Sequence, residues 1–152
     1  MTIDLASATG EGHGHQHCIM CGELNPLSLK LTFNDDEQGG VRTSFYGSPW
    51  LQGYHSLLHG GIICSLLDSA MTHCLFARQI KAVTGELKVR FLEPVPAEAE
   101  LTLSARITHS LPPLYRVEAQ LHKDDVLMAR AEAKFMQFDR LPSEPVQKEK
   151  SP

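Results

Sequence analysis

The chain has 152 residues, 42% of them hydrophobic, which is the size and composition of one globular domain with a buried core. Its 14 basic and 18 acidic residues give a net charge of −4, and the Lys and Arg residues are scattered, which argues against a nucleic-acid partner. No apolar run approaches the roughly 18 residues that span a bilayer, and residues 1–17 lack an apolar signal segment. We therefore expect a soluble, cytoplasmic protein with no membrane partner.

Both ends of the chain have the composition of tails. Residues 1–16 are small and polar without periodicity, and residues 141–152 are rich in Pro and charge. We expect a folded domain at 17–140 between flexible tails at 1–16 and 141–152.

Two strands are predicted first. Residues 27–33 (LSLKLTF) alternate between apolar and polar side chains, as in a half-buried strand. After the turn sequence DDEQGG, residues 41–46 (VRTSFY) alternate again, which predicts a hairpin.

One long helix is predicted in residues 57–79. Apolar residues recur there at helical spacing over most of the circumference, so the helix should be wrapped by protein. These residues are Ile63, Leu66, Leu67, Ala70, Met71, Cys74 and Leu75.

Four more strands follow, at residues 83–91, 101–107, 115–121 and 127–135, each with a period of two. The turn sequences EPVPAE, SLPP and KDD separate them. This order predicts an α+β fold in which an antiparallel sheet curls around one helix.

The helix carries two chemical signals. His59-Gly60-Gly61 stands at its start, where glycines permit close approach of a ligand and unpaired N–H groups can hold an oxyanion. Asp68 follows nine residues after His59, on a stripe with apolar residues. A carboxylate there is either a general base or nucleophile, or a structural tie to a neighbouring backbone or to Arg78.

The stretches QGYHSLLHGGIICSLLDSAM and VTGELKVRFLEPVP, with the opening CIMCGELNPLSLKLTF, resemble the hotdog-fold thioesterase superfamily, in its phenylacetate-pathway and thioesterase-superfamily-member branch. The resemblance covers most of residues 18–138. It implies that the Gly60 N–H polarises the thioester carbonyl, that Asp68 attacks or activates water and that Thr84 assists. It also implies a site shared by two protomers, so that Gly60 and Asp68 of one site come from different chains.

The sequence departs from the family pattern at two positions. Many relatives have Asn or Gln six residues before the histidine, where this chain has Gly53, and Gln52 replaces it only if the loop shifts by one residue. In the subgroup with the Cys-x-x-Cys-Gly opening a Glu often follows the acid, and here Ser69 follows.

Other residues near these signals have two interpretations each. His59 is a catalytic base or, as we favour, a brace for the loop. Gly61 adds to the close approach at the helix start. Lys88 and Arg90 bind CoA phosphates or form a solvated strand face. Aromatic residues near the helix line an acyl pocket or belong to the core; they are Trp50, Tyr54 and Phe76.

Four cysteines complete the inventory: Cys18, Cys21, Cys64 and Cys74. Two lie in the helical pattern, which favours reduced thiols over a disulfide framework. Cys18 and Cys21 follow His13, His15 and His17, which suggests zinc, but no second pair with finger-like spacing follows. We expect no metal and no other cofactor.

The sequence thus predicts an acyl-CoA thioesterase that releases a free acid and CoA. A non-catalytic acyl-CoA or fatty-acyl binding regulator on the same scaffold is the alternative, and a dehydratase of hydroxyacyl thioesters is disfavoured by the HGG and acid pattern. One sheet around one helix leaves edge strands and an apolar rim, so we expect a homodimer. A dimer of dimers is the alternative oligomeric state.

Overall fold

The structure, a computed structural model, describes residues 14–138. Residues 1–13 of the expected N-terminal tail and all of the expected tail at 141–152 lie outside this range. His15 falls inside the expected first tail, yet its ring packs edge-on against Phe76, with ring centroids 4.8 Å apart. Residues 14–16 of the expected tail are thus described, and His15 among them contacts the end of the helix.

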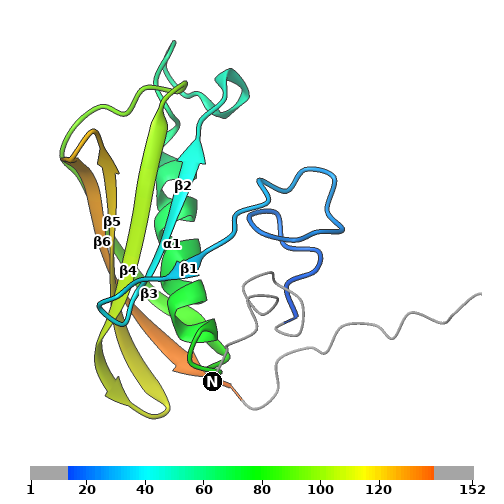
Figure 1. Ribbon diagram of the computed structural model, residues 1–152, viewed down its shortest axis with the longest axis vertical. Coiled ribbons are helices and arrows are strands. Elements are labelled where there is room, and N and C mark those ends of the chain that lie inside the picture. The colour runs from blue at the N-terminus through cyan, green and yellow to red at the C-terminus, as the bar shows by residue number, and fades with distance from the viewer. Residues whose placement is uncertain (1–13, 139–152) are drawn as a thin grey trace, which may run out of the picture.

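One helix lies against a six-stranded antiparallel sheet, which confirms the predicted α+β arrangement (Figure 1). The helix is α1 (Gly60–Phe76), and a short 3-10 helix, η2 (Pro49–Leu51), precedes it. The strands are β1 (Asn34–Asp35), β2 (Val41–Tyr46), β3 (Ala82–Phe91), β4 (Glu100–Leu111), β5 (Leu114–Lys123) and β6 (Val126–Gln137). In the sheet they follow the order β1-β2-β4-β5-β6-β3, so β3 is an edge strand.

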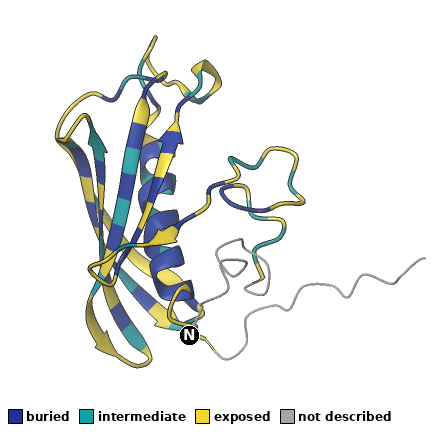
Figure 2. Cartoon of the chain, in the orientation of Figure 1, coloured by how far each residue is buried: buried dark blue, intermediate teal, exposed yellow. Residues whose placement is uncertain are grey.

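The apolar circumference of α1 forms the centre of the core, as Figure 2 shows. Leu66, Leu67 and Met71 have no exposed surface, and the facing strands bury alternate residues against them. Because the sheet curves around it, most of the helix is covered, and the predicted wrapped helix is confirmed. No helix within residues 14–138 combines the length and apolar character needed to cross a membrane.

The predicted strand at residues 27–33 is wrong. Its alternation does bury Leu31 and Phe33, but the segment forms no ladder, and only Asn34–Asp35 pair with β2. Lys30 has a positive φ of 54°, and the Leu29 and Leu31 N–H groups donate to the carbonyls of residues 19 and 20. An extended loop that buries side chains on one side thus shows the same apolar–polar alternation as a strand, although it pairs with no neighbouring strand.

Strand β3 lies at the edge of the sheet, and its pairing is irregular at one residue. Its pairing with β6 slips between Thr84 and Glu86, a β-bulge at Gly85. Thr84 stands opposite the buried Phe135, and Leu87 opposite the buried Ala133, so both face the helix side of the sheet. The bulge therefore moves Thr84 to the face opposite the one that strict alternation assigns to it.

Candidate active site

His59 caps the helix. Its Nδ1 accepts a hydrogen bond of 2.8 Å from the Gly61 N–H, which satisfies one donor of the first turn. A Cβ on Gly61 would lie 3.0 Å from that nitrogen, and one on Gly53 would lie 3.3 Å from the ring. The two glycines therefore make room for the capping ring, and this geometry favours the brace interpretation of His59 over the catalytic one.

The Gly60 N–H is the donor that remains at the helix start. It has no hydrogen-bond partner within residues 14–138, as expected for the first residue of a helix. Gly60 lies on the wall of a pocket of about 730 Å³ between the loop before α1 and the end of β3. Apolar side chains form most of the wall, among them Leu57, Ile63, Phe91 and Val95. An N–H at the positive end of a helix dipole, beside an apolar pocket, can polarise a carbonyl.

Asp68 forms the second centre with Thr84. The Thr84 hydroxyl donates a hydrogen bond of 2.6 Å to Asp68 Oδ1, which ties the middle of α1 to the start of β3. Burial raises the pKa of the Asp68 carboxyl above its ordinary 3.8, while the Thr84 hydrogen bond and the nearby His15 act in the opposite direction. The alternative of a structural tie to Arg78 finds no support, because the Arg78 guanidinium donates to the Gly39 carbonyl.

The bulge at Gly85 separates Thr84 from the basic residues of β3. Lys88 stands opposite Glu132 and Arg90 opposite Arg130, on the face that points away from the helix. Phe91, at the pocket, stands opposite Ala129 on the helix face. Lys88 and Arg90 therefore do not line the pocket of their own chain, and both are exposed.

Gly60 and Asp68 are eight residues apart on one helix. At a rise of about 1.5 Å per residue their backbones are separated by roughly 12 Å along the axis. A hydrogen-bond donor and a base that act on one carbonyl lie within about 3 Å of the reacting atoms. A single chain therefore does not bring the two predicted groups to one reaction centre.

The remaining predicted residues divide between the pocket and other places. Tyr54 lines the pocket and is 87% exposed. Gln52 lies next to it, where its side-chain oxygen accepts from the Ser56 N–H and closes the turn before the helix. Trp50 is 93% exposed and does not line the pocket. Phe76 is a core residue at the far end of α1, which agrees with the core interpretation of this side chain and not with the acyl-pocket one.

The sequence interpretation missed the contribution of Phe91 and residues 93–95 to the pocket. The alternation of residues 83–91 identifies Phe91 only as an apolar strand residue, yet it is 51% exposed. The PVP segment after it is joined to the loop before α1 by a hydrogen bond from the Leu58 N–H to the Val95 carbonyl. A signal was present in the apolar residue directly before a proline-rich turn.

Residues 55–129 match the thioesterase superfamily. A segment of 74 residues, 49% of this chain, is 32% identical to the acyl-coenzyme A thioesterase THEM4 of Bos taurus, of which it spans 30%. Among solved structures, that of a thioesterase superfamily protein superposes with a TM-score of 0.76 at 23% identity, over 90% of this chain and 69% of the other. The E. coli PaaI protein from the phenylacetic acid degradation operon gives a TM-score of 0.62 at 21% identity, over 66% and 73%. These similarities confirm the expected hotdog fold.

Proposed function

Because the chain belongs to the thioesterase superfamily, we propose that it hydrolyses an acyl-CoA thioester to a free acid and CoA. The observation that carries the proposal is the pairing of Asp68 with Thr84 across α1 and β3. A half-buried carboxylate that accepts one hydrogen bond keeps its second oxygen for water or for the carbonyl carbon.

In the proposed reaction Asp68 acts as general base or nucleophile. Oxygen from water joins the acyl carbon, the bond between that carbon and sulfur breaks, and the proton taken from water goes to the departing CoA thiolate. The Gly60 N–H stabilises the negative charge on the carbonyl oxygen. Thr84 orients Asp68 and favours its ionised form. In this proposal these groups act without a metal or redox cofactor at the reacting carbon.

The pocket beside Gly60 is the proposed place for the acyl group or the pantetheine arm. Its apolar wall and its volume of about 730 Å³ suit an extended apolar ligand with few polar groups. Tyr54 and Gly60 line it, Gly61 follows Gly60 but does not line it, and Gln52 holds the adjoining turn. Lys88 and Arg90 point away from the pocket of their own chain. We therefore propose that any contact they make with CoA phosphates is with CoA bound at the other protomer of the dimer.

We also propose that the active unit is a homodimer, in which Gly60 of one protomer and Asp68 of its partner share a site. Three observations support it: the two groups are roughly 12 Å apart in one chain, β3 offers a free edge of ten residues, and Val83, Leu87 and Phe91 on it are partly exposed. A second copy of β3 on this edge would pair the open backbone groups.

Turnover of the Asp68→Asn variant tests the catalytic proposal. Asn has nearly the same shape and keeps an oxygen that accepts from Thr84, so binding and thermal midpoint should change little. Loss of general-base assistance should lower turnover on the best of a panel of short, medium, long and aryl acyl-CoAs by about a hundredfold or more. A folded variant with the parent rate would refute the role and favour the acyl-CoA binding alternative.

Mixed dimers test the shared site. Co-expression of equal amounts of an Asp68→Asn chain and a chain without the Gly60 N–H makes half of the dimers mixed, and each mixed dimer has one intact site. About a quarter of the parent activity should then return, although each variant alone is nearly inactive. A mixture no more active than its components would contradict the shared site.

A further inference from the structure

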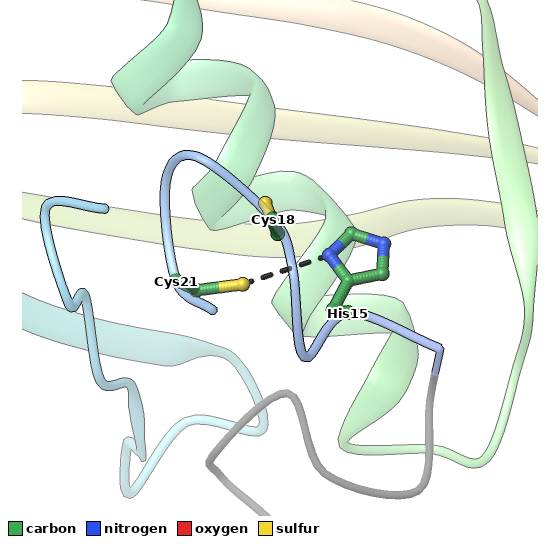
Figure 3. Close-up of side chains that lie close together, drawn as sticks. All are labelled: His15, Cys18 and Cys21. Carbon is green, nitrogen blue, oxygen red and sulfur yellow. Dashed lines mark hydrogen bonds between the residues drawn. The ribbon is translucent and has the colours of Figure 1, made fainter. Parts of the chain in front are cut away.

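We propose that His15, Cys18 and Cys21 bind a zinc ion that fastens the N-terminal loop to the end of α1. Their donor atoms all lie within 4.8 Å of one another, the one such group of His, Cys, Asp or Glu ligands within residues 14–138. Figure 3 shows the Cys21 side chain directed toward the His15 ring, with Cys18 close by on the same turn beside the helix. None of the three ligands takes part in the proposed hydrolysis, although His15 lies near enough to Asp68 to lower the pKa of that carboxyl.

The distances fit tetrahedral zinc. Zn–S bonds of about 2.3 Å and Zn–N bonds of about 2.0–2.1 Å at tetrahedral angles place sulfur and nitrogen about 3.5 Å apart, and two sulfurs about 3.8 Å apart. The Cys21 Sγ lies 3.5 Å from His15 Nδ1, and closure of the widest pair in the cluster needs a movement of about 1 Å. Two sulfur donors and one imidazole favour zinc over magnesium or calcium, which take oxygen ligands.

The backbone around the two cysteines is shaped to present them. The Met20 N–H points at Cys18 Sγ at 3.3 Å, a contact that stabilises a thiolate. The Gly22 N–H donates to the Cys18 carbonyl at 2.8 Å, and a Cβ on Gly22 would lie 2.5 Å from the Cys18 nitrogen. Only glycine permits this tight turn, so the Cys-x-x-Cys-Gly sequence has a structural reason that places both sulfurs on one side.

Residues 14–33 form neither helix nor strand, so a metal ion would add a link that regular secondary structure does not supply there. Cys21 and Met20 are buried against the core, while His15 and Cys18 are half-exposed. An ion held by these ligands would join the start of the ordered chain to the segment that covers α1. Water has access to the half-exposed side and can supply the fourth ligand.

This inference departs from the metal-free expectation drawn from the sequence. That expectation required a second pair of ligands downstream with finger-like spacing. The structure brings the third ligand from upstream, three residues before Cys18, where the contact of the His15 ring with Phe76 fixes its position. His17, two residues further on, is exposed and lies outside the cluster.

Elemental analysis of the full chain tests the proposal. The protein is produced without a polyhistidine tag in zinc-supplemented medium and purified without metal resin. We expect about one zinc per chain, and a cobalt-substituted form with thiolate charge-transfer absorption in the near ultraviolet. Chelation should lower the thermal midpoint by about 4 °C or more.

Matched variants separate this site from adventitious binding. His15→Ala and Cys18→Ser alter half-exposed residues and should fold, and each should weaken zinc affinity in a chelator competition by at least about tenfold. His17→Ala and Cys64→Ser should bind zinc as the parent does. Equal affinity in His15→Ala and His17→Ala would overturn the proposal, as would less than about 0.1 zinc per chain. A zinc-free chain lighter by about 2 Da, with Cys18 bonded to Cys21, would overturn it in favour of a thiol redox pair.

Discussion

Replacing Gly60 with proline removes the one N–H that the proposed mechanism assigns to the oxyanion. Gly60 is the first residue of α1, where an intrahelical bond is not made and proline's fixed φ suits the helix. His59 before it has φ −61° and ψ 135°, the extended conformation that a residue before proline prefers. The fold should therefore accept Gly60→Pro, with stability unchanged or raised by about 0.4–1 kcal/mol.

The chemical effect should be much larger than the structural one. Loss of one oxyanion donor costs about 2.7–4 kcal/mol of transition-state stabilisation, which is a fall of about 10²–10³ in kcat. Steady-state hydrolysis of the best acyl-CoA and thermal unfolding on the same preparation separate the two effects.

Gly60→Ala is the matched control for this experiment. Alanine keeps the N–H, and its Cβ would meet the Phe91 ring at 3.8 Å, an ordinary contact. Its kcat should stay within a few-fold of the parent, and any change should fall on KM, since the added methyl borders the pocket. If Gly60→Pro folds and turns over like Gly60→Ala, the oxyanion role of this N–H is refuted.

Three further predictions concern the groups around these centres. Thr84→Val removes the 2.6 Å hydrogen bond to Asp68 and should lower turnover by roughly tenfold or more. Because that bond lowers the pKa of Asp68, the acidic limb of the pH–rate profile should move to higher pH, whereas Thr84→Ser should behave as the parent does. His59→Ala removes the helix cap and should cost roughly 1 kcal/mol in denaturant unfolding, whereas His59→Asn should restore it; equal stability of the two variants would contradict the capping role. Burial raises the pKa of Asp68, so its contribution to stability is greatest below about pH 3.8 and falls as pH rises through the raised pKa. The free energy of unfolding of the parent, measured relative to Asp68→Asn in urea titrations, should therefore decrease from acid to neutral pH.

Much of the fold follows from periodicity in the sequence. The helix and the last four strands bury a continuous apolar face, so their patterns are long enough to identify them, and the turns at Pro112–Pro113 and Asp124–Asp125 lie where SLPP and KDD predict them. Residues 27–33 show the limit of this reasoning. Alternation reports which side chains are buried, but a strand also needs a neighbouring backbone, and here the loop at residues 19–20 takes that place.

The candidate site was predictable in its residue types and less so in its geometry. The capping role of His59 follows from its place before a helix start, and the half-buried setting of Asp68 follows from its place on an apolar stripe of the helix. The bulge at Gly85 does not follow, because a pattern of period two has no sign for an inserted residue. Strict alternation places Thr84 on the face of Lys88 and Arg90, whereas in the structure it lies on the opposite face.

The packing at the carboxyl end of α1 determines how accurately Gly60 is positioned at the amino end. Phe76 packs against the His15 ring, and His73 stacks on Phe33 at 4.6 Å between centroids, so this end is clamped by the N-terminal loop. The helix is about 25 Å long, so a tilt of about 2° about its packed carboxyl end displaces Gly60 by about 1 Å. Since a misplacement of that size costs roughly a hundredfold in rate, substitutions in residues 15–33 should alter turnover without touching the substrate.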